Sequence, residues 1–173
     1  MPFIRVKQEW EFGMSVRPRF STELEPVRFE LPPGKKLGGA IGAAFTPEGD
    51  LLVLHQWNPP GTETGDAKAE DFLPDVARSG PDGTFKDAWG GPDHIPHADG
   101  VPQWPAGREG IECDAAGNVW VFGYSAGDDA ALMFSPNGEL LRRFGQRGKK
   151  GTDGDTVLLG GPTGCWHDVE NRE

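Results

Sequence analysis

An internal repeat restricts the folds open to this 173-residue chain more than any other feature. Residues 42–54 align with residues 110–122 without a gap, and residues 79–90 align with residues 134–145. The two offsets, 68 and 55 residues, differ by 13, and the extra residues fall within residues 57–74. Because that stretch is acidic and rich in Pro, Gly and Thr, it predicts a long surface loop between the second and third strands of the first copy.

Turn signals divide each copy of the repeat into short strands. In the second copy, residues 116–118 (Ala-Gly-Asn) and 136–138 (Pro-Asn-Gly) each separate two short apolar runs. Asn and Gly tolerate the positive φ that tight hairpin turns need, so the sequence predicts four antiparallel strands between residues 109 and 145. The chain has 26 glycines and 16 prolines and no long stretch of helical periodicity, so we expect an all-β protein.

A third copy of the repeat opens near the end of the sequence. Gly164 aligns with Gly110, and Asp168 aligns with Asp114. A period of about 40–55 residues with four strands is typical of a β-propeller blade. The sequence therefore predicts a partial propeller of about two and a half antiparallel blades. These blades cover residues 38–90, 106–145 and, incompletely, 162–173.

Two expectations follow from the extent of the repeat. Residues 1–37 match nothing else in the chain, and the loose alternation over residues 17–30 suggests an edge or ring-closing strand that Pro32-Pro33-Gly34 ends. The partial propeller then spans residues 38–173. Because blades bury their faces against neighbouring blades, we expect either an N-terminal fragment, about half, of a longer propeller, or copies that self-associate to complete a ring.

Charge and composition exclude some classes of function. The formal net charge of −10 argues against nucleic acid as a partner, since its phosphates require clustered Lys and Arg. The one dense basic run, within residues 142–150, is interpreted as a solvated turn between units. The sequence begins without the apolar core of a signal peptide and contains no apolar run of membrane-spanning length. These features predict a soluble, cytoplasmic protein without a membrane partner.

The cysteines and several histidines have simple structural interpretations. Cys113 and Cys165 are too few for a disulfide framework and are expected to be small buried hydrophobes on inner strands. A nucleophilic role would require a neighbouring base, which the sequence does not show. His94 and His97 are expected in a water-exposed loop, because the proline between them disfavours a helix on which they would chelate. His167 is predicted to be a hydrogen-bonded strand residue.

Two motifs give the repeat a family resemblance. Residues 110–121 read Gly-Ile-x-x-Asp-x-x-Gly-Asn-Val-Trp-Val, and residues 134–145 read Phe-Ser-Pro-Asn-Gly-Glu-Leu-Leu-Arg-Arg-Phe-Gly. Together they resemble the NHL repeat of six-bladed propellers. Within that family, the chain is most similar to the peptidyl-α-hydroxyglycine α-amidating lyase group. This similarity rests on residues 54–56 (Leu-His-Gln), 108–110 (Arg-Glu-Gly) and 161–164 (Gly-Pro-Thr-Gly).

The resemblance implies a propeller with a central channel, but the chain departs from the lyases at two positions. Those enzymes hold a central zinc with three histidines, one of which corresponds to Glu109 here, and they carry an arginine where this chain has Gln56. The other metal histidines and the catalytic tyrosine would lie in blades that this chain does not contain. We therefore expect a scaffold that binds a small molecule or a partner protein at the channel mouth and the 57–74 loop. A metal-dependent lyase or hydrolase is the alternative, active in a longer parent chain with zinc or calcium as cofactor.

Five residues are the candidate site residues. The ligand-binding candidates are His55, Gln56, Arg108 and Thr163, and in the family the position of His55 faces substrate. Glu109 is the candidate metal ligand, because a carboxylate at the start of an innermost strand could bind zinc at about 2.0–2.2 Å, or calcium at longer distances. The alternatives for Glu109 are an exposed carboxylate at the channel mouth and an ion pair with Arg108.

Overall fold

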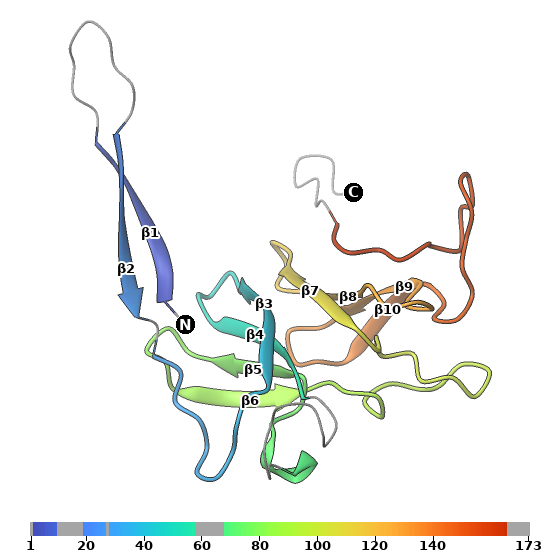
Figure 1. Ribbon diagram of the computed structural model, residues 1–173, viewed down its shortest axis with the longest axis horizontal. Helices are drawn as coiled ribbons and strands as arrows, with labels where there is room; N and C mark the ends of the chain where they lie inside the picture. The colour runs from blue at the N-terminus through green and yellow to red at the C-terminus, as the bar shows by residue number, and fades with distance from the viewer. Residues whose placement is uncertain (1, 10–18, 27, 58–67, 166–173) are drawn as a thin grey trace, which may run out of the picture.

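The computed structural model describes residues 2–9, 19–26, 28–57 and 68–165. Across these residues the protein is built from strands, and its one helical segment is a short 3₁₀ turn, η1 (Ala69–Asp71). Figure 1 shows two four-stranded sheets beside each other and a separate two-stranded hairpin. The all-β prediction is confirmed. No helix in the described part of the chain has the length and apolar character needed to cross a membrane.

Each four-stranded sheet is an antiparallel meander in which consecutive strands are hydrogen-bonded neighbours. The first sheet contains β3 (Gly39–Phe45), β4 (Leu51–Gln56), β5 (Val76–Ser79) and β6 (Phe85–Trp89). The second sheet contains β7 (Arg108–Cys113), β8 (Val119–Gly123), β9 (Ala130–Phe134) and β10 (Leu140–Gly145). The four strands predicted between residues 109 and 145 are confirmed, and the first copy of the repeat forms the same arrangement.

The N-terminal region forms a hairpin of its own. Strand β1 (Pro2–Glu9) pairs with β2 (Arg19–Pro26) in antiparallel register, and neither is hydrogen-bonded to a four-stranded sheet. The sequence predicted only one strand here, over part of residues 17–30. The chain then returns to the first sheet, where the Glu30 N–H donates to the Gly83 carbonyl at 2.8 Å. The expected break at Pro32-Pro33-Gly34 is a turn, closed by a 3.0 Å bond from the Lys35 N–H to the Pro32 carbonyl.

Side chains at the start of each hairpin turn fix the turns of the second sheet. Gly117 adopts a φ of 84°, and the Asp114 carboxylate accepts hydrogen bonds from the backbone of Ala116 and Asn118 at 2.9 and 2.8 Å. Burial opposes the charged form of Asp114, but these bonds, with others from the side chains of Asn118 and Trp120, hold its pKa below the ordinary value. These local bonds explain why the turn positions are predictable from the sequence.

The hydrophobic core lies between the two sheets. Apolar side chains of the first sheet pack against those of the second, and the connection between the sheets adds two more. The buried members are Leu52, Leu54, Val76, Trp89, Ile95, Trp104, Ile111, Val119, Val121, Leu132 and Phe134. Aromatic rings dominate the centre, since Trp89 and Phe134 have ring centroids 4.9 Å apart and Trp104 and Phe134 have centroids 5.6 Å apart.

The aromatic cluster depends on one glycine of the second sheet. Gly138 has a φ of 80°, and a Cβ placed on it would lie 2.6 Å from two atoms of the Trp89 indole. His94 also joins this cluster, because its ring stacks on Trp89 at 5.5 Å and its Nε2 lies 2.6 Å from the Gly138 carbonyl oxygen. His94 is exposed in a loop, as predicted, and these ring contacts are additional to that exposure. His97 is exposed, as predicted.

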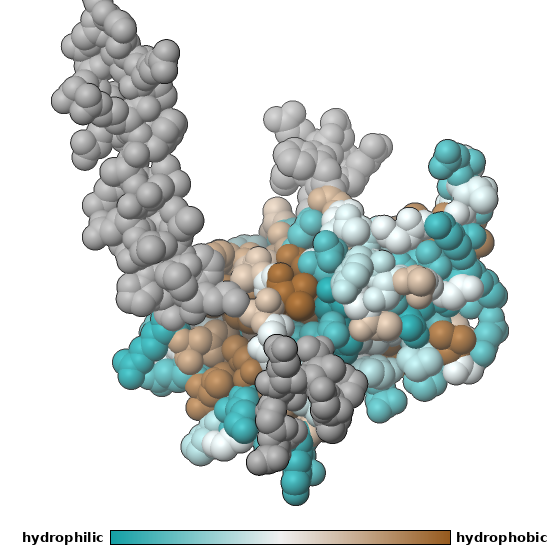
Figure 2. All heavy atoms as spheres, viewed as in Figure 1, coloured by the Kyte–Doolittle hydropathy of each residue, from teal (hydrophilic) through white to brown (hydrophobic). Residues whose placement is uncertain are grey.

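The long insertion of the first copy connects β4 and β5, the second and third strands of its sheet, as predicted. Residues 58–67 lie outside the described residues, and the remainder contains η1. In Figure 2, apolar residues gather over the first sheet and its border with the second, whereas the surface over the second sheet is mostly hydrophilic. Ile41 and Phe45 of β3 contribute to the exposed apolar surface, with 42% and 54% of their area accessible.

Candidate functional site at the inner strands

The first strand of each sheet lies beside the first strand of the next unit. A Cβ placed on Gly42 of β3 would lie 3.3 Å from Ile111 Cγ2 and 3.8 Å from the Gly110 Cα of β7. On the other side of β7, a Cβ placed on Gly110 would lie 3.1 Å from the Thr163 carbonyl oxygen. The glycines that the repeat aligns therefore allow β3, β7 and the segment around Thr163 to approach closely.

A β-bulge interrupts both inner strands at the same place in the repeat. The register of β3 against β4 shifts between Ala40 and Gly42, and the register of β7 against β8 shifts between Arg108 and Gly110. The extra residues are Ile41 and Glu109, which align in the repeat, and both side chains are exposed. Bulges re-aim side chains and occur often beside functional sites.

The third unit supplies the equivalent residue, Thr163, which is also exposed. We name Ile41, Glu109 and Thr163 the inner-strand row. Each member precedes a glycine that packs against a neighbouring strand or segment, and each comes from a different unit. An apolar side chain, a carboxylate and a hydroxyl therefore occupy equivalent positions on adjacent inner strands.

Of the alternatives for Glu109, the structure matches an exposed carboxylate and not an ion pair with Arg108. Among the described residues Glu109 makes no hydrogen bond or ion pair through its side chain, and Arg108 pairs with Asp75 instead. No group of three His, Cys, Asp or Glu side chains in the described part of the chain is placed to hold a metal ion. Glu109 is thus a solvent-facing carboxylate that belongs to no such group among those residues.

Arg108 joins the two sheets through a buried ion pair. Its Nε donates to Asp75 Oδ2 at 2.8 Å, its Nη2 contacts the same oxygen, and only 12% of its side chain is accessible. Trp104 Nε1 donates to that oxygen at 2.6 Å. Because Asp75 precedes β5 and Arg108 begins β7, this pair fixes the first sheet to the second. Gln56 contributes a long bond, in which its Oε1 accepts the Arg108 N–H at 3.4 Å.

His55 is fully buried beside this pair. Its Nδ1 accepts the Gly38 N–H at 3.2 Å, which places the ring proton of the neutral form on Nε2, and Nε2 is buried without a partner. Burial is the main reason that the pKa of His55 lies below its ordinary value, although the Asp75 carboxylate and the Pro74 carbonyl act in the opposite direction. His55 is therefore neutral and shielded from solvent, while Gln56 is half-buried.

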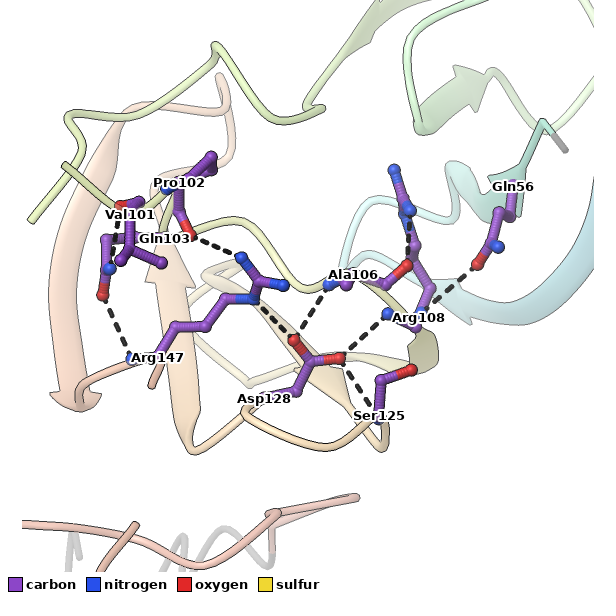
Figure 3. Close-up of polar contacts among 10 residues, drawn as sticks. Gln56, Val101, Pro102, Gln103, Ala106, Arg108, Ser125, Asp128 and Arg147 are labelled. Atoms are coloured by element: carbon purple, nitrogen blue, oxygen red, sulfur yellow. Dashed lines mark hydrogen bonds and ion pairs between the residues drawn. The ribbon is translucent and has the colours of Figure 1, made fainter. Parts of the chain in front are cut away.

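A second buried carboxylate holds the segment that leads into β7. The Asp128 carboxylate accepts the backbone N–H groups of Ala106 and Gly107, both at 2.9 Å, and that of Ser125 at 3.2 Å. Arg147 Nε donates to Asp128 Oδ1 at 2.8 Å (Figure 3). These bonds tie the loops after β8 and β10 to the residues just before Arg108.

The basic run within residues 142–150 is only partly solvated. Arg147 is bound to Asp128, Arg143 donates to the buried Gln103 at 3.2 Å, and Lys149 pairs with Asp99 at 2.8 Å. The interpretation as a solvated turn holds for Arg143 and Lys149, which are exposed, but not for Arg147, whose side chain is 20% accessible and is paired with the buried Asp128. Arg143, Arg147 and Lys149 each contact a residue that is distant in the sequence.

The two cysteines are half-buried rather than fully buried. Burial, followed by the nearby Asp114 and Glu48 carboxylates, raises the pKa of Cys113 to about 11. Burial and then Glu112 raise the pKa of Cys165 to about 12. Neither thiol is activated as a nucleophile.

The structure therefore separates the five sequence-predicted site residues into two groups. His55, Gln56 and Arg108 come together around Asp75, where the polar groups are largely buried and paired. Glu109 and Thr163 lie in the inner-strand row. Sequence reasoning missed Asp75, Trp104 and Ile41. Asp75 and Trp104 belong to no recognisable sequence motif. Ile41 could have been identified as a candidate because it is the repeat equivalent of Glu109.

Comparison with known proteins does not extend this description. No family model matches the chain, and a search of curated proteins gives no match.

Proposed function

We propose that the chain is part of an NHL-type β-propeller scaffold that binds a ligand or a partner protein at the inner-strand row. The observation that carries this proposal is the pair of equivalent bulges, which expose Ile41 and Glu109 on adjacent inner strands. In a propeller, these strands surround the central channel, so the row would lie at the channel mouth.

Two features support the propeller architecture. Each copy of the repeat forms one four-stranded meander, and the core is the packing of one meander on the next. The inner strands follow one another in chain order, since β7 lies between β3 and the segment around Thr163. Repetition of one such step generates a ring or a solenoid of sheets.

The chemistry of the row favours recognition over a purely structural role. The glycine after each member is the same in all three units, because the inner strands approach closely at that point. The exposed residue before it changes from Ile to Glu to Thr, so packing does not dictate its identity. The row fits a ligand that places an apolar group on Ile41 and a cation or hydrogen-bond donor on Glu109.

The buried polar groups near the row support binding rather than acid–base chemistry. Arg108 is neutralised by Asp75, and burial keeps His55 uncharged. A metal-dependent lyase or hydrolase in a longer parent chain remains the alternative, in which Glu109 would hold zinc or calcium. Titration calorimetry with zinc chloride distinguishes the two proposals. Stoichiometric binding that disappears in Glu109→Ala favours the enzyme.

Selection of peptides from a random phage-displayed library provides the test of the binding proposal. Selected peptides are synthesised and titrated by fluorescence anisotropy against the native chain and against Ile41→Asp and Glu109→Gln. Val157→Asp is the matched control, because Val157 is also an exposed aliphatic residue, with 73% of its area accessible.

We expect Ile41→Asp to weaken binding by at least about tenfold, equivalent to about 1.4 kcal/mol, and Val157→Asp to have no effect. Glu109→Gln should weaken binding most for peptides that contain Lys or Arg. Peptides that bind all four proteins equally, or a failure to enrich any peptide, would contradict a binding site at the inner-strand row.

A further inference from the structure

An aromatic ring borders the inner-strand row. Tyr124, the single tyrosine of the chain, follows β8, and 63% of its area is accessible. Its N–H donates to the Gly107 carbonyl at 3.0 Å, so it extends the pairing of β7 with β8 beyond the end of β8. A Cβ placed on Gly107 would lie 3.0 Å from Tyr124 Cε1. The ring therefore lies against the segment that enters β7, just before Glu109.

The face of the second sheet that carries Tyr124 is the face that meets the third unit. Tyr124 alternates with Phe122 along the chain, and alternate residues of a strand share a face. Phe122 pairs with Gly110. A Cβ placed on Gly110 would lie 3.7 Å from Phe122 Cδ2 and 3.1 Å from the Thr163 carbonyl oxygen. Tyr124 is therefore on the Thr163 side of the second sheet, at the end of β7 where Glu109 lies.

The first unit offers a reason for the exposure of this ring. The repeat aligns Gln56 with Tyr124, and Gln56 Oε1 accepts the N–H of Arg108 at the start of the next inner strand (Figure 3). The repeat also aligns Arg108 with Pro162, which has no N–H to donate. Tyr124 therefore cannot make the contact that Gln56 makes between two units, in keeping with its exposed side chain.

The charge beside the ring is negative. Among the described residues Glu109 forms no ion pair, whereas the neighbouring Arg108 is neutralised by Asp75. The face of an aromatic ring and a carboxylate each attract an organic cation. An anionic group would be repelled by Glu109, and the formal net charge of −10 opposes its approach as well. The electrostatics of the row therefore favour a cationic ligand.

We propose that the inner-strand row binds an organic cation of the alkylammonium class between the Tyr124 ring and the Glu109 carboxylate. This assignment rests on the proposed function, because it names the ligand chemistry of the same site. Ile41 then contacts the apolar chain that carries the ammonium group. A small amine and a lysine side chain of a partner protein present this same group to the site.

Titrations followed by two-dimensional NMR of the isotope-labelled chain test the assignment. The probes are phenylbutylammonium, its neutral analogue phenylbutanol, and a blocked Leu-Lys-Leu peptide with its Nε-acetylated counterpart. The protein variants are Tyr124→Leu, which removes the ring, Tyr124→Phe, which keeps it, and Glu109→Gln. Phe45→Leu and Glu139→Gln are the matched controls, because both residues are exposed and lie outside the row.

We expect phenylbutylammonium to shift the amide signals of Ile41, Glu109 and Tyr124, and to bind at least about fivefold more tightly than phenylbutanol. Tyr124→Leu and Glu109→Gln should each weaken its binding about threefold, whereas Tyr124→Phe and the two controls should leave its binding unchanged. The lysine peptide should likewise bind more tightly than its acetylated form. The tighter of the two cationic probes identifies the source of the cation.

Equal binding of phenylbutylammonium and phenylbutanol overturns the inference, as does equal binding of phenylbutylammonium by Tyr124→Leu and Tyr124→Phe. The absence of a shift with either cationic probe overturns it too. The phage-selected peptides separate these failures from failure of the proposed function. If such peptides bind and Ile41→Asp weakens their binding, the row is a binding site for another class of ligand. If neither peptides nor amines bind, both proposals fail.

Discussion

Replacement of Asp75 by alanine measures how strongly the buried ion pair joins the two sheets. The substitution leaves the Arg108 guanidinium, 12% accessible, without its carboxylate, and leaves the buried Trp104 indole N–H without an acceptor. Removal of one partner from a buried ion pair costs about 3–5 kcal/mol, and an orphaned buried donor costs about 1–3 kcal/mol. Because both donors use the same oxygen, the two costs overlap. We expect the free energy of unfolding to fall by about 4 kcal/mol.

Urea unfolding followed by tryptophan fluorescence and circular dichroism measures this loss. Glu30→Ala is the control, because the Arg28–Glu30 pair is exposed, at 79% and 50% accessible, and should contribute less than about 1 kcal/mol. A combined Asp75→Ala and Arg108→Met variant removes the stranded charge and should be more stable than Asp75→Ala alone. If Asp75→Ala costs no more than Glu30→Ala, the two sheets are not held together as described.

Three further predictions test local features of the structure. Gly138→Ala should lower the free energy of unfolding by about 2–4 kcal/mol, whereas Gly127→Ala, with a similar φ of 88° but open space around it, should cost about 1–2 kcal/mol. If urea unfolding shows that the two variants lose equal free energies of unfolding, contact with the Trp89 indole does not determine the cost of Gly138→Ala. The lowered pKa of His55 means that its stabilising contribution is present above the ordinary pKa of 6.5 and is lost as the pH falls from there toward the folded-state pKa. His55→Gln should therefore flatten the decline in unfolding free energy between about pH 7 and pH 5. If the slope of unfolding free energy against pH is unchanged in this variant, His55 does not have a lowered pKa in the folded protein. The raised pKa values of Cys113 and Cys165, about 11 and 12, lower the thiolate fraction at pH 8 in the folded protein. Reaction with an aromatic disulfide reagent should therefore be slower than in denaturant, by about a hundredfold for Cys113 and about a thousandfold for Cys165. Rapid reaction of the folded protein would show that the two thiols do not lie in half-buried sites beside carboxylates.

The elements that the sequence predicts well are those set by local interactions. Gly117 and Gly138 adopt the positive φ that their turns require, and the turns fix the register of the strands on either side. The short, largely apolar runs between the turns then form β7 to β10. The same reasoning applied to the first copy gives β3 to β6, since the repeat transfers each turn.

The features that the sequence does not reveal depend on distant partners. In the N-terminal hairpin, β1 pairs with β2 through backbone hydrogen bonds that no side-chain pattern predicts. The Asp75–Arg108 pair spans 33 residues, and the bond between Arg147 and Asp128 crosses from one loop to another. A bulge inserts one residue without a turn residue or a change in alternation that would mark it. Glu109 was identified because the resemblance to the lyases implies a metal histidine at that position, whereas Ile41, its equivalent in the first copy, was not identified at all.

The claim that ligands bind at the inner-strand row is tested most directly by hydrogen exchange with a selected peptide bound. Mass spectrometry compares the free and bound chains, segment by segment, at saturating peptide. We expect protection to be concentrated in the segments that contain Ile41, Glu109 and Thr163, with little change in the turns between β9 and β10 or after β10. Protection confined to those turns, with none at the three inner-strand segments, would contradict the claim.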